Sequence, residues 1–368
     1  MKPTPLSPRD SDLLSQAVSL ARRGLYTTKP NPRVGCVICQ GETLVGEGWH
    51  QRAGEAHAEI LALQQAGEQA RGAEVFVSLE PCAHQGRTGP CAQALIDAGV
   101  RRIVVAMADP NPKVCGKGLA LMKQAGMEVV LADDDMGARD LNGGFCQRME
   151  HGRPLVRLKL GATMDGRTAA NDGTSQWITG EEARADVHDL RARSCAVVTG
   201  IGTIRNDNPR LNARVDGDVV QPLRVVLDGN GQMSLGARLF SEPGQILVVT
   251  AKDTEEAGYD FDDRTEQICL TGKGSRVDIA AVLATLAARS CNEVLIEAGA
   301  GVAGAFLSGG LVDEIWVYQS PDVLGSGGHG MFVMRGIRTL EERVRLELSD
   351  VTRIGRDLRL ILRPQDSQ

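Results

Sequence analysis

The segment EVFVSLEPCAHQGRTGPCAQALIDAG, residues 74–99, joins a β-strand to an α-helix through a loop that carries two cysteines. Residues 74–79 have the apolar, valine-rich pattern of a buried strand, and residues 91–98 have helical character and end at Gly99. Cys82 thus follows the strand, and Cys91 begins the helix. The segment predicts a β-loop-α unit with two sulfur ligands in its loop.

The residues around this unit alternate between strands and helices. An amphipathic helix over 10–24, with Asp10, Ser11 and Asp12 as possible caps, precedes a hairpin formed by 34–39 and 43–49. The remaining elements expected in this half are a helix over 57–70, a strand over 102–107, a helix over 116–125 and a strand over 127–132. This order predicts a mixed, mostly parallel sheet with helices on both faces.

The rhythm breaks at Asp133, Asp134 and Asp135 and again at residues 149–154, so we expect two domains, 1–150 and 151–368. In the second half, Thr179 and Glu182 are spaced as a capping box for a helix over 180–193. The other elements expected there are strands over 155–162, 195–200, 223–228, 246–250, 293–299 and 313–318, a helix over 277–290 and a closing hairpin within 345–363.

Composition limits the possible functions. The 368 residues carry a formal net charge of -6, which gives no basic field for a nucleic-acid backbone, so a small-molecule substrate is favoured over a polymer. We find neither a signal peptide nor a long apolar run, and therefore expect a cytoplasmic protein without a membrane segment. Nine cysteines are then better explained as core residues or metal ligands than as disulfides.

His57 and Glu59 stand two positions apart where a helix begins. Together with Cys82 and Cys91, His57 provides three possible zinc ligands, and Glu59 lies next to them in the sequence without being a ligand. One imidazole and two thiolates leave one position of a tetrahedral site open, as in catalytic zinc sites, where the ion lowers the pKa of water to about 7. Glu59 could move the proton of that water to the leaving amine. The pattern H-x-E followed by P-C is that of zinc deaminases, but the second cysteine comes nine positions after the first instead of three.

Two alternatives to this interpretation stay open, and a second pair of cysteines needs its own explanation. His57 could be an ordinary helix histidine beside buried thiols, or the three side chains could form a structural zinc site. Cys36 and Cys39 form a C-x-x-C pattern, but residues three apart on a strand face opposite sides, so we expect them in the core.

The order of PNPRVGCVI, HAEILAL, EPCAHQGRTGPC and ADPNPKVCGKGL resembles the deaminase domain of the bifunctional deaminase-reductase family of riboflavin biosynthesis. LKLGATMDGRTA, GTSQWITG, GIGTIRNDNPRLNAR and IEAGAGVAGAFL resemble the reductase of the same family, so the resemblance covers nearly the whole chain. It implies a cytidine-deaminase-like α/β/α sandwich followed by a dihydrofolate-reductase-like α/β domain. The implied cofactors are zinc and NADPH.

The resemblance also implies the reactions. The first domain would hydrolytically deaminate 2,5-diamino-6-(5-phosphoribosylamino)pyrimidin-4-one, and the second would reduce the ribosyl chain to give 5-amino-6-(5-phosphoribitylamino)uracil. Carried over residue by residue, the ligands of the deaminase substrate would be Asn31, His50, His84, Arg87, Asp109 and Asn111. Arg87, in a loop with glycines on either side, would suit a phosphate.

GAGVAG, residues 299–304, matches the dinucleotide pattern G-x-G-x-x-G, although it lies late in the chain and a tight turn without a ligand is the alternative. By resemblance, NADPH would contact Gly161, Trp177, Thr203, Asp207, Gly229, Gly299, Ala300, Gly301, Val302, Ala303, Gly304 and Ala305. The substrate of the reductase would contact Lys159, Ser175, Arg191, Leu211, Arg214 and Glu297. RNDN at 205–208 is more polar than the corresponding segment of the family.

Two other functions remain open at this point. One is a nucleic-acid deaminase with an accessory domain, which would need a basic, aromatic-lined groove that this acidic chain with three tyrosines does not favour. The other is a non-catalytic module that binds zinc and a nucleotide, against which Glu59 argues. A homo-oligomer is implied by the family alone.

Overall fold

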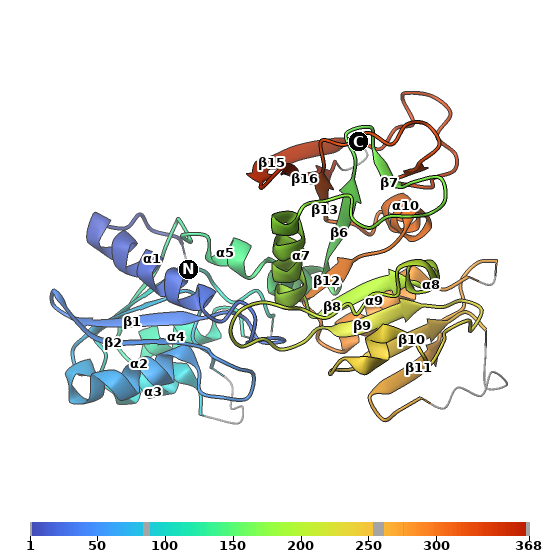
Figure 1. Cartoon of the computed structure of the whole chain (residues 1–368). Helices are drawn as coiled ribbons and strands as arrows, with labels where there is room; N and C mark the ends of the chain where they lie inside the picture. Colours follow the sequence, from blue (N-terminus) through green and yellow to red (C-terminus); the bar gives the residue numbers. More distant parts are fainter. Residues whose placement is uncertain (1, 84–88, 113, 253–260, 275, 366–368) are drawn as a thin grey trace. The chain divides into compact units, whose positions relative to one another are not determined.

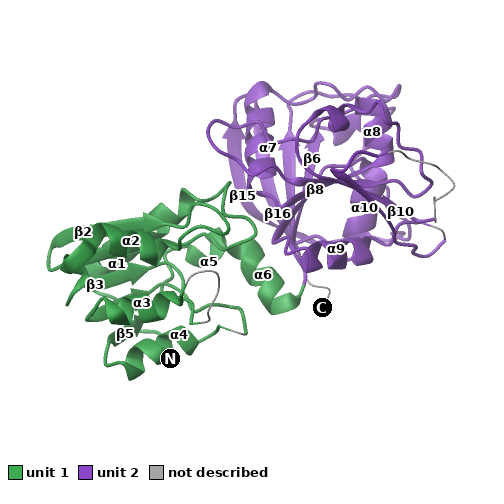
Figure 2. Ribbon diagram, turned by 90° about the horizontal axis from the view of Figure 1, so that it is seen from below, with its two compact units in different colours: residues 1–152 green, residues 153–368 purple. Residues whose placement is uncertain are grey.

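The computed structural model describes residues 2–83, 89–112, 114–252, 261–274 and 276–365. The chain divides into two compact units, Met1–Gly152 and Arg153–Gln368 (Figure 2). Within the described ranges, no helix has the length and apolar character needed to cross a membrane.

The first unit alternates helices with short strands (Figure 1). In chain order they are α1 (Pro8–Arg22), β1 (Gly35–Gln40), β2 (Thr43–Trp49), α2 (Ala58–Ala66), the 3-10 turn η1 (Gly67–Ala70), β3 (Glu74–Val77), α3 (Cys91–Asp97), β4 (Arg102–Val105), α4 (Lys117–Gln124), β5 (Glu128–Leu131), α5 (Ala138–Leu141) and α6 (Gly143–His151).

These strands form one sheet in the order β2-β1-β3-β4-β5, in which β1 is antiparallel to both neighbours while β3, β4 and β5 are parallel. Residues of α1, α5 and α6 pack against one face of the sheet, and residues of α2, α3 and α4 pack against the other. The parallel strands β3 and β4 are adjacent, so the loops that follow them leave the same edge of the sheet. That edge carries Cys82 and Asp109.

The second unit repeats the three-layer plan with a larger sheet. Its elements are β6 (Leu155–Ala162), β7 (Arg167–Ala169), α7 (Glu181–Arg193), β8 (Ala196–Gly200), α8 (Ile201–Asp207), β9 (Leu223–Leu227), η2 (Arg238–Ser241), β10 (Ile246–Thr250), β11 (Thr265–Cys269), α9 (Ile279–Ala288), β12 (Glu293–Ile296), α10 (Ala300–Ser308), β13 (Glu314–Gln319), β14 (His329–Gly330), β15 (Leu346–Ile354) and β16 (Asp357–Pro364).

The main sheet of this unit has the order β11-β10-β9-β8-β12-β6-β13-β16-β15. Its pairs are parallel from β11 to β13, and the hairpin of β16 and β15 adds two antiparallel strands at one edge. Helices α9 and α10 pack on one face, and α7 and α8 pack on the other. Both units thus have the α/β class that the alternation predicted.

The positions of Cys36 and Cys39 confirm the prediction that the two cysteines lie in the core and face opposite sides of their strand. Both are buried on β1, but Cys36 belongs to the core cluster under α2 and α3, whereas Cys39 belongs to the cluster under α1. The two thiols therefore face opposite sides of the sheet and share no ligand.

The predicted helix caps were wrong in both units. Helix α1 begins at Pro8, and Ser7, not Asp10, Ser11 or Asp12, caps it by accepting from the backbone nitrogen of Asp10. Proline suits the first helical position because its φ is already helical.

In α7 the cap is Gly180, without a side-chain hydrogen bond, so Thr179 and Glu182 do not form a capping box. The buried carboxylate of Asp357, on β16, accepts a 2.7 Å hydrogen bond from the backbone nitrogen of Gly180. A partner distant in sequence therefore fixes the start of the helix in place of the local box.

Candidate functional site

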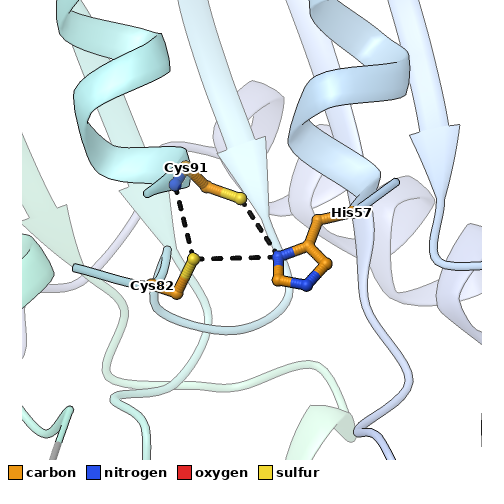
Figure 3. A group of neighbouring side chains, drawn as sticks. All are labelled: His57, Cys82 and Cys91. Atoms are coloured by element: carbon orange, nitrogen blue, oxygen red, sulfur yellow. Dashed lines mark hydrogen bonds between the residues drawn. The ribbon is translucent and has the colours of Figure 1, made fainter. Parts of the chain in front are cut away.

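Three potential metal ligands meet in the first unit. His57 is the residue before α2, Cys82 follows β3, and Cys91 is the first residue of α3. Figure 3 shows the imidazole and both thiols pointing toward one another. His57 Nδ1 lies 3.2 Å from Cys91 Sγ and 3.7 Å from Cys82 Sγ.

These distances fit a zinc ion. Zinc in a tetrahedral site binds nitrogen at about 2.0–2.1 Å and sulfur at about 2.3 Å, which places two such ligand atoms about 3.6 Å apart. All three ligand atoms lie within 4.8 Å of one another, and no fourth His, Cys, Asp or Glu of the described chain joins the group. A set of one nitrogen and two sulfurs leaves a fourth position for a non-protein ligand.

The electrostatics of the three ligands favour a thiolate. The hydrogen bond from the Cys91 side chain lowers the pKa of Cys82 to about 4, against the opposing effect of burial, and the Cys91 backbone nitrogen donates to the same sulfur at 3.3 Å. The hydrogen bond with Cys82 raises the pKa of His57. The pocket therefore stabilises negative charge on the Cys82 sulfur, whereas the hydrogen bond with Cys82, together with burial, raises the pKa of Cys91.

Glu59 lies beside the ligands in the first turn of α2 and is only 3% exposed. Burial raises its pKa from 4.5 to about 7. A carboxyl group that exchanges its proton near neutral pH is suited to general acid and base catalysis.

Asn31 and His50 adjoin the ligands. Asn31 Nδ2 lies 3.0 Å from His50 Nε2, and His50 Nδ1 lies 3.2 Å from the carbonyl oxygen of Ala56. Because the amide nitrogen of Asn31 only donates, His50 Nε2 must accept from it, and His50 Nδ1 then donates to the carbonyl oxygen of Ala56. Burial lowers the pKa of His50, and its ring meets the ring of His57 edge to face at 5.4 Å. The structure thus brings Asn31 and His50 to the metal ligands.

Asp109 and Asn111 lie in the loop after β4, where Asp109 Oδ1 accepts a 2.8 Å hydrogen bond from the backbone nitrogen of Asn111. The buried carboxylate of Glu80 organises this loop. Its oxygens accept from four backbone nitrogens, those of Asp109, Gly116, Gly118 and Leu119. Glu80 was not among the predicted site residues, because backbone donors leave no signal in the sequence. His84 and Arg87 lie outside the described residues.

A cavity of about 880 Å³ lies in the second unit, at the carboxyl ends of β6, β8 and β12. Most of the predicted reductase residues line it together. They are Lys159, Gly161, Ser175, Trp177, Arg191, Thr203, Asp207, Leu211, Arg214, Glu297, Gly299, Ala300, Gly301 and Val302.

Glu297 and Arg191 form the central ion pair of the cavity wall. The guanidinium donates to both carboxylate oxygens, at 2.5 and 2.8 Å. Burial opposes the charge of Glu297, but Arg191 and then Lys159 keep its pKa below the usual value of 4.5. Burial lowers the pKa of Lys159. The cavity therefore contains an ionised carboxylate beside an amine that is easier to deprotonate than usual.

The glycine-rich segment divides into two parts with different roles. Gly299 caps α10, and its backbone nitrogen donates to Thr203 Oγ1 at 3.2 Å. By contrast, Ala303, Gly304 and Ala305 do not line the cavity. A Cβ added at Gly304 would stand 2.2 Å from the carbonyl oxygen of Val333, so this glycine permits close packing of α10.

Gly229 also lies outside the lining of the cavity. Its nearest side-chain neighbours belong to Ala251 and Val277, at 3.7 and 3.9 Å from an added Cβ. Ser175 and Asp207, predicted to contact different ligands, are hydrogen-bonded to each other at 2.8 Å.

Both units of the chain match families of known proteins. The family described as "Cytidine and deoxycytidylate deaminase zinc-binding region" matches residues 7–107, and that described as "RibD C-terminal domain" matches residues 154–360. The riboflavin biosynthesis protein RibD of Escherichia coli strain K12 is 40% identical over 366 residues, which cover 96% of this chain and 99% of the relative.

Solved structures extend the agreement to the whole fold. A structure of Acinetobacter baumannii RibD has a TM-score of 0.90 and 44% identity, and the match covers 97% of this chain and 99% of the other. A Thermotoga maritima structure, described as a diaminohydroxyphosphoribosylaminopyrimidine deaminase/5-amino-6-(5-phosphoribosylamino)uracil reductase, has a TM-score of 0.86 and 30% identity, with coverage of 97% and 99%. The chain belongs to the RibD family.

RibD membership confirms the family resemblance, the α/β fold class and the bifunctional activity expected from the sequence. This RibD-family chain is a deaminase and reductase of riboflavin biosynthesis, and its cofactors are zinc and NADPH. His57, Cys82 and Cys91 all lie in the span that matches the zinc-binding region, and the cavity lies in the span that matches the RibD C-terminal domain.

Proposed function

We propose that residues 1–150 deaminate 2,5-diamino-6-(5-phosphoribosylamino)pyrimidin-4-one, and that residues 151–368 then reduce the ribosyl chain with NADPH to give 5-amino-6-(5-phosphoribitylamino)uracil. The observation that supports this most strongly is the convergence of His57, Cys82 and Cys91 beside the buried Glu59. The arginine-rich cavity of the second unit supports the second step.

In the deaminase, His57, Cys82 and Cys91 would hold zinc, which supplies Lewis acidity and makes water acidic enough to act as a nucleophile near neutral pH. Glu59 takes a proton from the attacking water and delivers it to the departing amine, since its pKa of about 7 allows both transfers. Asn31 and His50 orient the pyrimidine ring from their fixed hydrogen-bonded pair.

The other deaminase ligands are proposed from the resemblance to the family. Asp109 and Asn111 would bind the substrate from the loop that Glu80 holds. His84 and Arg87 would bind its phosphoribosyl arm and phosphate. An arginine suits the phosphate because two parallel N–H groups match two phosphate oxygens.

In the reductase, NADPH supplies the hydride, and the protein orients the sugar against it. Glu297 and Lys159 would contact the ribosyl chain, where an ionised carboxylate can accept from sugar hydroxyls. Ser175, Leu211 and Arg214 would complete the substrate site. Arg191 is already engaged by Glu297, so its main effect is to fix that carboxylate.

The cofactor contacts proposed for NADPH are Gly161, Trp177, Thr203, Asp207 and the turn 299–302, all of which line the cavity. The backbone nitrogens at the beginning of α10 would favour the diphosphate. Ala303, which is buried, and Gly304 are assigned to packing instead, and Gly229 and Ala305 lie outside the lining of the cavity. We further propose that the enzyme is cytoplasmic and acts as a homo-oligomer, as the family resemblance implies.

The experiment is to incubate the enzyme with the diaminopyrimidine nucleotide, with and without NADPH, and to follow ammonia release and NADPH oxidation. Glu59→Gln should abolish ammonia release while zinc stays bound and the deaminated intermediate is still reduced. Glu68→Gln, a change at an exposed acid of the same unit, is the matched control. Normal deamination by Glu59→Gln would refute the assigned role of Glu59.

A further inference from the structure

Five arginines line the cavity of the second unit, and they differ in how their charges are compensated. Arg191 is paired with Glu297, and Arg210 lies 3.1 Å from Glu242. Arg184, Arg214 and Arg238 have no carboxylate within ion-pair distance among the residues that the structure describes, and of these three Arg214 is the one that His188 contacts. An anion entering the cavity would therefore find Arg214 with its charge uncompensated.

Arg214 is nevertheless held in place, by two neutral groups. Nη1 donates to Asn212 Oδ1 at 2.6 Å, and Nη2 lies 2.7 Å from Nε2 of His188, a residue of α7. A guanidinium only donates hydrogen bonds, so Nε2 must accept. The backbone N–H of Arg214 also points at the ring, 3.2 Å from Nδ1, but a neutral imidazole accepts at only one nitrogen. The shorter contact with the charged guanidinium assigns that acceptor to Nε2 and the ring proton to Nδ1.

The surroundings of His188 keep its ring neutral. Burial, together with the positive charges of Arg191 and Arg214, lowers its pKa to about 4, and Glu297 opposes this only in part. A neutral ring orients Arg214 without cancelling its charge. A carboxylate at the same place would orient Arg214 equally well but would occupy it, as Glu297 occupies Arg191.

The backbone beside Arg214 is held independently of His188. The side chain of Gln221 accepts from the backbone nitrogen of Ala213 and donates to its carbonyl oxygen, both at 2.9 Å. Leu211 and Asn212 are buried. Loss of the imidazole should therefore release the guanidinium while the segment keeps its place.

We propose that His188 is a positioning residue that aims Arg214 at the phosphate of the reductase substrate. The proposal rests on the proposed function and deepens it, because it explains how one of the cavity's cations is kept free for an anion. Both side chains line the cavity, as the proposal requires.

The test compares His188→Phe, which keeps a ring but removes the acceptor, with His188→Gln, whose amide oxygen can stand near the position of Nε2. A hydrogen bond to a charged group contributes about 1.5–3 kcal/mol, so His188→Phe should raise KM for the phosphorylated substrate roughly tenfold or more. We expect kcat to change less and KM for NADPH to stay the same. His188→Gln should recover most of the lost affinity.

A second measurement is the affinity for inorganic phosphate by titration calorimetry, which does not depend on turnover. His188→Phe should bind phosphate about tenfold more weakly than the wild type, and His188→Gln should bind it nearly as well. Equal phosphate affinity in the wild type and His188→Phe would overturn the inference, as would equal losses in both variants together with a changed KM for NADPH. Failure of the wild type to oxidise NADPH would instead refute the proposed function, while the phosphate titration still decides the role of His188.

Discussion

Glu80 accepts a 3.1 Å hydrogen bond from the backbone nitrogen of Asp109, and so ties together the loops that follow two adjacent parallel strands. Its second oxygen accepts from Gly118 and Leu119, in the first turn of α4. The buried carboxylate of Glu80 therefore caps a helix and fixes the loop of Asp109. Glu80 itself stands two residues before the metal ligand Cys82. The loop after β4 and the beginning of α4 are therefore both held by a side chain from the loop that carries Cys82.

Replacing Glu80 by glutamine should damage the deaminase unit selectively. Glutamine retains one acceptor oxygen, but its NH2 group faces backbone N–H groups that need an acceptor, and an unsatisfied buried donor costs about 1–3 kcal/mol. We expect lower stability and a raised KM for deamination, with NADPH-dependent reduction of the deaminated intermediate unchanged. Unfolding curves and separate assays of the two reactions measure this. Equal behaviour of Glu80→Gln and the exposed control Glu68→Gln would show that the loop does not need the carboxylate.

The glycines of α10 provide a matched pair of stability predictions. Gly304→Ala places a methyl group 2.2 Å from the carbonyl oxygen of Val333, so the helix must shift, at a cost of about 1–3 kcal/mol. Gly301→Ala meets no atom within 4 Å and should stabilise the helix by about 0.5–1 kcal/mol. Urea unfolding of the reductase unit, monitored through the loss of NADPH oxidation, compares the stabilities of the two variants. A stable Gly304→Ala variant would contradict the packing role.

The carboxylate of Glu74 predicts how stability depends on pH. Burial alone would raise its pKa, but hydrogen bonds and charges of neighbouring arginines keep it below 4.5; these are Arg9, Arg102 and Arg101. Because the folded-state pKa is lower than the unfolded one, the stabilisation is complete above about pH 4.5 and is lost as the pH falls through the folded-state pKa.

Glu74→Gln should therefore be less stable than the wild type at pH 7, by about 1–2 kcal/mol, and the difference should shrink as the pH falls through the folded-state pKa of Glu74. Chemical unfolding at a series of pH values tests this. Glu42→Gln is the control, because Glu42 is 96% exposed at 4.0 Å from Arg9 and should change stability by less than about 0.5 kcal/mol. A stability difference between Glu74→Gln and the wild type that grew as the pH fell would contradict the stabilising role of the Glu74 carboxylate.

Local residue patterns predicted some elements of the fold at their observed positions and missed others. Strands such as β6 (Leu155–Ala162) and β10 (Ile246–Thr250) were predicted to the residue, because apolar runs between turns define a buried parallel strand. Helix α8 was missed because the Gly, Thr, Asn and Asp residues of IGTIRND favour turns. Strand β11 was missed because TEQIC is short, polar and only partly buried.

The same distinction applies to the sites. His57, Cys82 and Cys91 could be grouped from the sequence because each residue type is a zinc ligand and each stands at an element boundary. Glu80, Asp357 and His188 could not be identified in this way, since each acts on a partner far away in the sequence. The match to G-x-G-x-x-G gave Gly304 a ligand role, whereas its position against Val333 indicates packing.

The central claim is that one imidazole and two thiolates hold zinc in the deaminase unit. X-ray absorption at the zinc edge, recorded on the purified full-length enzyme, tests it most directly. We predict one zinc per chain with two sulfur neighbours at about 2.3 Å and lighter neighbours at about 2.0–2.1 Å. Four sulfur neighbours, an ion bound only by oxygen and nitrogen, or an enzyme that deaminates without any metal would contradict the account.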